Sequence, residues 1–289
     1  MIIIGLSNSR ELARKVAKKL KVKYSSLDFE QFPDGEVYLR FRDKVKGKNV
    51  VLIQSMQPRV NDALIETLFA SATAKDLGAK KVILVAPYLS YMRQDKRFKP
   101  GECISNEIVA KFIDDYVDQV FVVDPHLHRD KSLSVFFKIK STKLTANPLI
   151  AAYIKKKIKN PLLIGPDWES YKWARATAEM IGAESVILKK KRYSGRRVKV
   201  YFGEKIDVKG KNAVLVDDMI STGGTLLRTI EHLKKLGLRK FTCVAVHGVF
   251  SEGALGKLKK AGATVITANT IENPTAKLDI SGIIADALK

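Results

Sequence analysis

The chain has 289 residues, of which 46% are hydrophobic, and a formal net charge of +22 at pH 7. This length is enough for two hydrophobic cores of ordinary domain size. No run approaches 18 consecutive apolar residues, so we expect no membrane span, and the N-terminus lacks the pattern of a signal peptide. Cys103 and Cys243 lie far apart without metal-ligand spacing, and we expect both to be buried, reduced thiols in a cytoplasmic protein.

The excess of lysine and arginine has three interpretations. It fits nucleic-acid binding, a polyanionic small ligand, or a solvated lysine-rich surface of the kind found in thermophiles. The basic runs are short and separate, and the sequence contains no helix-turn-helix or zinc-finger pattern. We therefore favour a polyanionic small molecule together with a solvated surface, and expect no nucleic-acid partner.

Short β-branched runs alternate with amphipathic helical patterns along the chain. The expected strands span 1–4, 50–53, 81–86, 119–123, 162–164, 185–189, 213–216, 240–247 and 264–268. The expected helices span 10–20, 62–77, 105–116, 171–181 and 225–236. This alternation predicts an α/β fold with mainly parallel sheets, helices on both faces, and ligand sites at the carboxyl ends of the strands.

An internal repeat divides the chain into two copies of one α/β unit. GKNVVLIQSM (47–56) matches GKNAVLVDDM (210–219) at an offset of 163 residues, and LGAKKVILVA (77–86) matches LGLRKFTCVA (236–245) at an offset of 159. Ser-Thr and Asn-Pro interrupt the pattern near 141–147. The repeat therefore predicts two domains, 1–142 and 143–289.

The stretch VLVDDMISTGGT (214–225) carries the strongest chemical signal in the second copy. Asp217 and Asp218 follow an apolar strand, and a glycine-containing turn then leads into a helix. The turn consists of Ser221, Thr222, Gly223, Gly224 and Thr225. Its backbone N–H groups suit an anion, and the carboxylates beside it suit ribose hydroxyls, either directly or through Mg²⁺ joined to phosphate oxygens. The alternative, an ordinary capped helix start, explains only one threonine.

The first copy has lost this chemistry. Gln54 and Ser55 stand where the second copy has its acidic pair, and Gln-Pro-Arg-Val replaces the glycine-containing turn. Only the second copy can therefore carry the sugar-phosphate site.

This stretch resembles the ribose-5-phosphate-binding signature of the phosphoribosyltransferase superfamily. With the doubled architecture, the whole chain resembles the archaeal-type ribose-phosphate diphosphokinase (PRPP synthetase) family. The resemblance implies two tandem phosphoribosyltransferase-like domains, the first binding ATP and the second binding ribose 5-phosphate, with the last helix packed on the first domain. It implies transfer of the diphosphoryl group of Mg-ATP to O1 of ribose 5-phosphate, giving PRPP and AMP for nucleotide biosynthesis. It also implies a homo-oligomer, a dimer or higher, with Mg²⁺ as cofactor.

Two further motifs are similar to the ATP-binding elements of the family. PYLSYMRQDKRF (87–98) follows a predicted strand, and the resemblance implies that Arg93 and Gln94 contact ATP. FPDGEVYLRF (32–41) is by local rules a turn followed by an alternating strand. The family uses such a loop to hold adenine across a subunit boundary, and three residues are carried over on that basis: Phe32, Asp34 and Glu36.

Three more motifs complete the implied site. DPHLHRD (124–130) resembles an element that places His126 at the Mg-ATP phosphates as a metal ligand, supported by Asp124. In GPDWES (165–170), Asp167 alone would be an N-cap, but the resemblance implies a carboxylate near ribose and metal. LKKKRYSGRR (188–197) is by itself a basic loop, and the resemblance implies that Lys190 and Arg192 neutralise the transferring phosphoryl group.

Other functions remain open at this stage. A phosphoribosyltransferase that consumes PRPP would not need the Arg93 and Phe32 motifs, and a non-catalytic regulatory subunit would not need Lys190 or Arg192. No Walker loop occurs, so ATP must be bound in another way. Many relatives carry an acidic residue at the position of Phe98, a small residue at Trp168 and Asp at Ser221.

Overall fold

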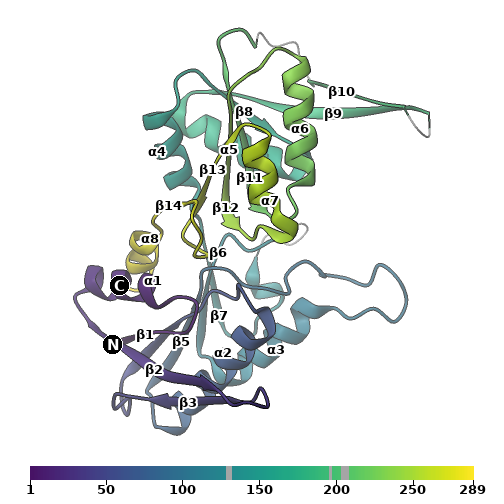
Figure 1. The fold of residues 1–289 in the computed structure, drawn as a ribbon. Coiled ribbons are helices and arrows are strands. Elements are labelled where there is room, and N and C mark those ends of the chain that lie inside the picture. The colour runs from purple at the N-terminus through teal and green to yellow at the C-terminus, as the bar shows by residue number, and fades with distance from the viewer. Residues whose placement is uncertain (128–131, 195–196, 203–207) are drawn as a thin grey trace. The chain divides into compact units, whose positions relative to one another are not determined.

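A computed structural model describes residues 1–127, 132–194, 197–202 and 208–289, and the side chains of 188–207 lie outside this description. The chain divides into two compact units (Figure 1). The N-terminal unit comprises Met1–Thr145, Thr270–Glu272 and Ile280–Lys289, and the C-terminal unit comprises Ala146–Asn269 and Asn273–Asp279.

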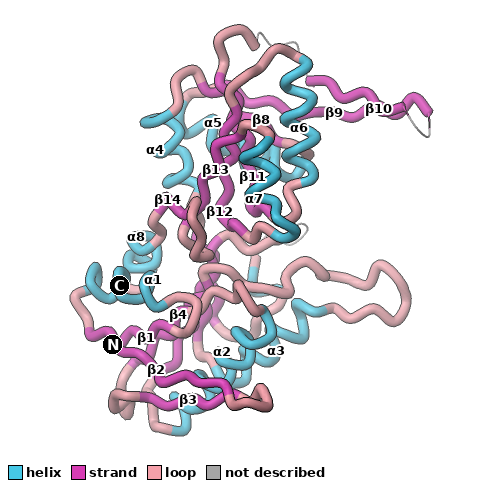
Figure 2. The backbone as a smooth tube through the Cα atoms, in the orientation of Figure 1, coloured by secondary structure: helices cyan, strands magenta, loops and turns pink. Residues whose placement is uncertain are grey.

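The N-terminal unit is built on a seven-stranded sheet in the order β3-β2-β1-β4-β5-β6-β7. Its strands are magenta in Figure 2. Its strands are β1 Ile2–Gly5, β2 Lys23–Gln31, β3 Val37–Phe41, β4 Asn49–Ile53, β5 Lys81–Ala86, β6 Gln119–Val123 and β7 Lys140–Leu144. Its helices are α1 Arg10–Leu20, α2 Val60–Asp76, α3 Ser105–Tyr116, the 3₁₀ turn η1 Leu133–Val135 and α8 Ser281–Ala287. The pairings are parallel except for the β2–β3 hairpin at the edge.

The C-terminal unit repeats this topology in the order β10-β9-β8-β11-β12-β13-β14. Its strands are β8 Pro161–Gly165, β9 Glu184–Ser194, β10 Arg197–Phe202, β11 Asn212–Ile220, β12 Phe241–Gly248, β13 Ala263–Ala268 and β14 Ala276–Leu278. Its helices are α4 Asn147–Lys157, α5 Trp168–Ile181, α6 Gly224–Lys235, the 3₁₀ turn η2 Ser251–Gly253 and α7 Ala254–Lys260. Only β10 runs antiparallel to its neighbour among these strands.

The central strands are buried on both faces, as parallel sheets require. In β4, Val50 and Leu52 belong to the core cluster under α2 and α3, whereas Val51 and Ile53 are equally buried but lie outside that cluster. Because side chains alternate along a strand, these two face the other layer, which contains α1 and α8. The predicted fold of two mainly parallel sheets flanked by helices is confirmed.

Two helices pack away from the strand that precedes them in sequence. α4 follows β7 but packs on α5 in the C-terminal unit. α8 follows β14 but packs on α1 in the N-terminal unit. Each unit therefore has a helix supplied by the chain segment that leaves the other unit.

A glycine ends the first strand of each sheet because a helix backbone passes directly over it. A Cβ on Gly5 would lie 2.7 Å from the Cα of Arg10, and one on Gly165 would lie 2.3 Å from the Cα of Tyr171. Real Cβ contacts are longer than this, so both positions exclude larger residues. These contacts seat α1 and α5 against the ends of β1 and β8.

Several elements were missed by the sequence patterns: β2, β7, β10, β14, α4, α7 and α8. Most are polar, short or at a sheet edge, where hydrophobic periodicity is weak. One expectation about the thiols is wrong: Cys103 is exposed because it lies in the loop that precedes α3, whereas Cys243 in β12 is buried. Within the described residues, no helix combines the length and apolarity needed to cross a membrane.

Candidate active site

The acidic pair lies where β11 continues beyond the end of β8. Pairing with β8 stops at Leu215, opposite Ile164, whereas pairing with β12 continues to Ile220 opposite Gly248. The sequence predicted a strand that ends at 216, and this is wrong because buried Met219 and Ile220 extend it along β12. Asp217 and Asp218 therefore lie inside a strand that has lost one of its two neighbours, at the ligand-binding edge of the sheet.

Three carboxylates share this edge. Burial raises the pKa of Asp217 well above its usual range, and the negative charges of Asp218 and Asp167 raise that pKa further. Asp217 Oδ1 also accepts the Asp218 N–H at 3.0 Å. Burial, and then the negative charge of Asp217, raise the pKa of the Cys243 thiol to about 12. The structure thus brings the predicted Asp167 to the predicted pair and creates a site that favours a cation or hydroxyl donors.

Asp167 owes its position to the start of α5. Its carboxylate accepts the N–H of Ser170 at 3.0 Å, while the Ser170 hydroxyl accepts the N–H of Asp167 at 3.0 Å. This capping box fixes the first turn, and the close contact at Gly165 fixes the helix on the sheet. Asp167 is therefore the N-cap expected from local rules, and its negative charge also raises the pKa of Asp217. Next to it, Trp168 is 62% exposed.

The turn between β11 and α6 is suited to an anion. Gly223 has φ 71° and is the N-cap of α6, so the chain needs a residue that tolerates the left-handed region. The helix has no acidic residue in its first turn and no side-chain cap hydrogen bond, which leaves the positive end of its dipole for a ligand. Ser221 and Thr222 precede this helix start, and the Ser221 Oγ lies 3.5 Å from the Ser251 Oγ.

Arg228 is a site residue that the sequence patterns missed. Its Nη1 atom lies 3.6 Å from the position of a Cβ on Gly224, and the Thr222 Oγ1 lies 3.8 Å from the same point. A guanidinium beside the turn adds positive charge and two directed donors for a phosphate. The spacing from Gly224 to Arg228 is one helical turn, which was the available signal.

The segment after β5 carries the predicted ATP residues. The Ser90 Oγ donates to the Met56 carbonyl at 2.8 Å, and the Ser105 Oγ donates to the Tyr91 carbonyl at 3.1 Å, so both ends of this segment are held. Arg93 is exposed and Gln94 is half-buried. Phe98, where many relatives have an acid, is 60% exposed with the Lys96 Nζ 5.1 Å from its ring centroid.

The β2–β3 hairpin presents its tip to solvent. Phe32 is 50% exposed and packs edge-on against Tyr38 at a centroid distance of 6.2 Å. Asp34 and Glu36 are exposed, and the Asp34 carboxylate accepts the Glu36 N–H at 3.1 Å. β1 and β4 separate β2 from β5, so the two strands are about 14 Å apart across the sheet.

The remaining predicted residues follow β6 and lie in β9. Asp124 is fully buried with φ 38°, and His126 is half-buried at the same sheet edge as the segment after β5. His128 lies outside the described residues. The backbone of Lys190 and Arg192 lies in β9, which pairs with β10 through Lys190↔Val200 and Arg192↔Val198. The predicted strand end at 189 is therefore wrong, and the side chains of both residues are outside the description.

Metal binding needs more than the protein side chains of this site. In the described parts of the chain, no three His, Cys, Asp or Glu side chains form a group that could hold a metal ion alone. The neighbouring carboxylates of Asp167, Asp217 and Asp218 nevertheless supply hard oxygen ligands. Mg²⁺ typically uses one or two carboxylates and takes its other ligands from water and substrate phosphates, so these residues fit that ion.

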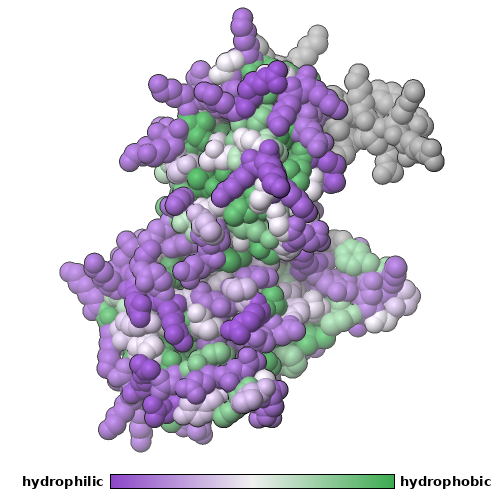
Figure 3. Space-filling view, viewed as in Figure 1, coloured by the Kyte–Doolittle hydropathy of each residue, from purple (hydrophilic) through white to green (hydrophobic). Residues whose placement is uncertain are grey.

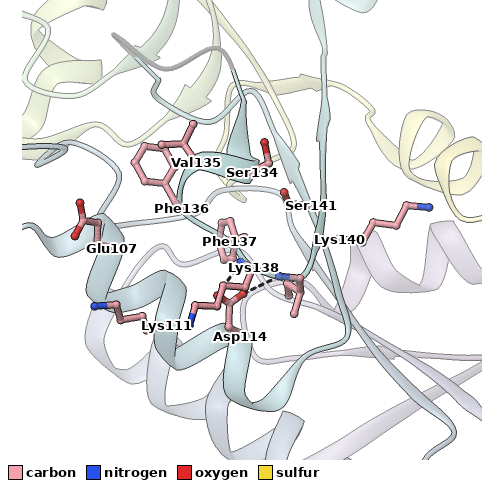
Figure 4. A pocket seen from close by; sticks show the side chains of 11 residues that line it. Glu107, Lys111, Asp114, Ser134, Val135, Phe136, Phe137, Lys138, Lys140 and Ser141 are labelled. Carbon is pink, nitrogen blue, oxygen red and sulfur yellow. Dashed lines mark hydrogen bonds between the residues drawn. The ribbon is translucent and has the colours of Figure 1, made fainter.

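A separate cavity of about 710 Å³ lies in the N-terminal unit. It is formed by one face of α3 and the segment from η1 to β7, and Asp114 accepts the Lys138 N–H at 2.9 Å on its wall (Figure 4). None of the predicted site residues lines it. The cavity therefore contributes nothing to the sites described above.

Comparison with known proteins agrees with this geometry. Residues 1–116 match the N-terminal domain of ribose phosphate pyrophosphokinase, and residues 137–280 match the phosphoribosyl transferase domain. Each unit thus has the phosphoribosyltransferase type of fold. The crystal structure of phosphoribosylpyrophosphate synthetase from Mycobacterium smegmatis is similar over 99% of this chain and 97% of its own, with a TM-score of 0.87 and 29% identity.

Relatives of this kind match over the full chain. The ribose-phosphate pyrophosphokinase of Pyrococcus furiosus is 36% identical over 97% of both chains. That of Methanothermobacter thermautotrophicus is 37% identical over 100% of both chains. The chain belongs to the ribose-phosphate pyrophosphokinase family.

Proposed function

We propose that this chain is an active ribose-phosphate pyrophosphokinase that uses ATP and ribose 5-phosphate. The observation that carries this proposal is the cluster of Asp167, Asp217 and Asp218 beside an uncapped helix N-terminus at one sheet edge. Carboxylates and an anion cradle side by side fit a ligand that has hydroxyls at one end and a phosphate at the other. Ribose 5-phosphate has that shape.

Each end of the sugar phosphate has its own partners. The 5-phosphate binds the backbone N–H groups and hydroxyls of the turn, together with the Arg228 guanidinium. The turn residues are Ser221, Thr222, Gly223, Gly224 and Thr225. Asp217 and Asp218 accept hydrogen bonds from the ribose hydroxyls, which relieves the mutual repulsion of the carboxylates. Binding thus orients O1 for attack.

ATP occupies the N-terminal unit's ligand edge. Arg93, Gln94 and His126 position its phosphates. The exposed tip formed by Phe32, Asp34 and Glu36 holds the adenine of ATP bound to a second copy, and an aromatic ring that is half exposed suits base stacking.

The chemical step is a direct displacement at phosphorus. The O1 oxygen of ribose attacks the β-phosphorus, the bond from that phosphorus to the α-phosphate oxygen breaks, and AMP leaves with the bonding electron pair. The O1 proton is lost to solvent or a nearby base. Lys190 and Arg192 neutralise charge on the transferring group, a role worth about 2.7–4 kcal/mol of barrier per donor. Mg²⁺ held by Asp167 and the acidic pair, with His126 at the ATP phosphates, supplies charge neutralisation when bound.

We further propose a cytoplasmic homo-oligomer, a dimer or higher, in which a second copy covers the outer faces of α2 and α3. Five large apolar side chains on these adjacent helices are at least 40% exposed: Ile65, Phe69, Ile108, Phe112 and Tyr116. Apolar surface is visible in this region (Figure 3). Patches of this kind mark interaction sites more often than free surface. The unpaired thiols of Cys103 and Cys243 suit a reducing compartment.

Product analysis tests the activity. Incubation with Mg-ATP and ribose 5-phosphate should give AMP and PRPP in equal amounts. Phosphorus NMR measures both products. Lys190→Ala should lower kcat about 10²–10³-fold with an unchanged circular dichroism spectrum. Formation of ADP and a singly phosphorylated sugar would refute diphosphoryl transfer, and salt-sensitive retention on DNA without AMP formation would favour the nucleic-acid interpretation.

A further inference from the structure

The N-terminal sheet holds a counterpart of the acidic site at matching register. Gly5 pairs with Ile53, and Gly165 lies opposite Val216 by the Ile164↔Leu215 register. The residues that follow Gly5 and Ile53 in the first unit are therefore equivalent to those that follow Gly165 and Val216 in the second. Three residues of the N-terminal unit correspond to Asp167, Asp217 and Asp218 in that order: Ser7, Gln54 and Ser55.

A carboxylate from α2 fills this counterpart site. The Glu66 Oε1 accepts the Ser7 N–H at 2.9 Å, and its Oε2 accepts the Ser7 hydroxyl at 2.5 Å and the Gln54 Nε2 at 2.6 Å. Glu66 is 1% exposed, so these donors replace its hydration. Burial raises the pKa of Glu66, while hydrogen bonds from Ser7 and Gln54 lower it.

The helix that carries Glu66 is longer than its counterpart at its N-terminal end. The repeat offset falls from 163 before the helix to 159 after it, so the first copy holds four more residues, about one helical turn. α2 accordingly has 17 residues and α6 has 12. At the offset of 159, Glu66 corresponds to Thr225, the second residue of α6. The extra turn of α2 lies before this position, where the second copy has the glycine-containing turn. Glu66 therefore presents its carboxylate from a helical position at which the second copy has a threonine.

We propose that Glu66 is an internal ligand: its carboxylate occupies the first unit's counterpart of the sugar-phosphate site. The three N–H and O–H donors around it form a small carboxylate-binding site that the chain fills itself. Removing the side chain beyond Cβ should expose this site to a free anion of the same shape. Acetate matches the deleted atoms, since its methyl carbon replaces Cγ and its carboxylate replaces that of Glu66.

The network also fixes the segment that follows β4. The Gln54 Oε1 accepts the Asn8 N–H at 3.1 Å, and the Asn8 Nδ2 donates to the carbonyls of Ser55 at 3.0 Å and Pro58 at 3.1 Å. Filling the site with Glu66 therefore stabilises the backbone from 54 to 58. This segment connects to the ATP side through the Ser90 hydrogen bond to Met56.

The test compares two cavity variants of α2 by thermal unfolding of the full-length protein. Glu66→Ala removes the internal carboxylate, and Leu64→Ala removes a similar volume from another buried position of the same helix. Both should lower Tm in chloride. Replacing chloride by acetate at the same ionic strength should raise the Tm of Glu66→Ala by about 2–4 °C more than that of Leu64→Ala or the wild type. Acetamide, which has the same shape without the charge, should not. Equal acetate shifts in all three proteins would overturn the proposal.

A second pair of variants keeps the proposal testable if Glu66→Ala does not fold. Glu66→Gln turns an amide N–H₂ toward the Gln54 donor, so it should lower Tm although it conserves the shape. The exchange variant Glu66→Gln with Gln54→Glu restores one carboxylate facing one amide, and should recover at least half of the lost Tm. Additive losses in the double variant would show that the carboxylate is not recognised by these donors, and would refute the internal ligand.

Discussion

The two units have the same strand register, but the side chains at the equivalent positions differ in their interactions. In the N-terminal unit, the Glu66 carboxylate accepts hydrogen bonds from Ser7 and Gln54 and fills the counterpart of the acidic site. In the C-terminal unit, burial and the negative charges of Asp218 and Asp167 disfavour ionisation of Asp217. The first arrangement stabilises the folded protein without a ligand. The second destabilises it by charge repulsion until a cation or hydroxyl donors bind.

This difference shows how a duplicated fold separates stability from binding. Glu66 brings a carboxylate to donors at a position where α6 has Thr225, and the additional first turn of α2 stands where the second unit has its glycine-containing turn. Internal hydrogen bonds stabilise the site in the N-terminal unit. In the C-terminal unit, we expect the corresponding stabilisation to come only when a substrate binds. Four predictions sharpen or break this comparison.

The largest effect is expected at the acidic pair. Asp218→Asn should lower kcat about 10²–10³-fold, because it removes the carboxylate that we propose as a ribose or metal ligand. The same change should raise the free energy of unfolding of the ligand-free protein by roughly 0.5–2 kcal/mol, because it removes a like charge from beside Asp217. Steady-state kinetics and urea unfolding measure the two effects. Asp286→Asn, at an exposed position in α8, is the matched control and should change neither. A destabilised Asp218→Asn protein would contradict the repulsive site.

The next effect concerns the glycines that are shared by both units. Gly5→Ala and Gly165→Ala should each lower the free energy of unfolding by about 1–3 kcal/mol or more, because a Cβ would meet the Cα of Arg10 or Tyr171. Gly256→Ala in α7, where a Cβ would meet nothing within 4 Å, should instead stabilise by about 0.5–1 kcal/mol. Urea unfolding compares the three. A harmless Gly165→Ala would mean that α5 can shift, and Asp167 would then lose its fixed position.

The parallel sheets, the duplication and the acidic pair were all predictable from sequence, since each rests on a local pattern. Glu66 was not, because its partner Ser7 lies 59 residues away and only the register of β1 with β4 brings them together. The change of repeat offset was the visible trace of the longer helix. The position of Lys190 in a strand was also missed, because lysine-rich β-hairpins lack hydrophobic alternation.

A smaller effect is expected in the pH dependence of stability. Burial raises the pKa of Glu66 above that of the unfolded chain, against opposing effects of Ser7, Gln54 and the Arg10 charge. Between the ordinary and the raised pKa, the folded state binds more protons than the unfolded state, so stability falls as the pH rises. The stability difference between wild type and Glu66→Gln should therefore be largest at low pH and decrease through this window, as measured by urea unfolding at several pH values. A difference that grows with pH would show that the donors outweigh burial.

The smallest effect is expected at Ser55, the counterpart of Asp218. Its Oγ is buried without a hydrogen-bond partner among the residues that the structure describes, whereas its N–H donates to the Ser9 Oγ at 2.8 Å. Ser55→Ala should therefore change the free energy of unfolding by no more than about 0.5 kcal/mol, while Ser9→Ala should cost about 1 kcal/mol or more because it leaves the Ser55 N–H unpaired. Urea unfolding separates these values. A large cost for Ser55→Ala would mean that its hydroxyl has a hydrogen-bond partner, so that the first unit's network extends to the counterpart of Asp218.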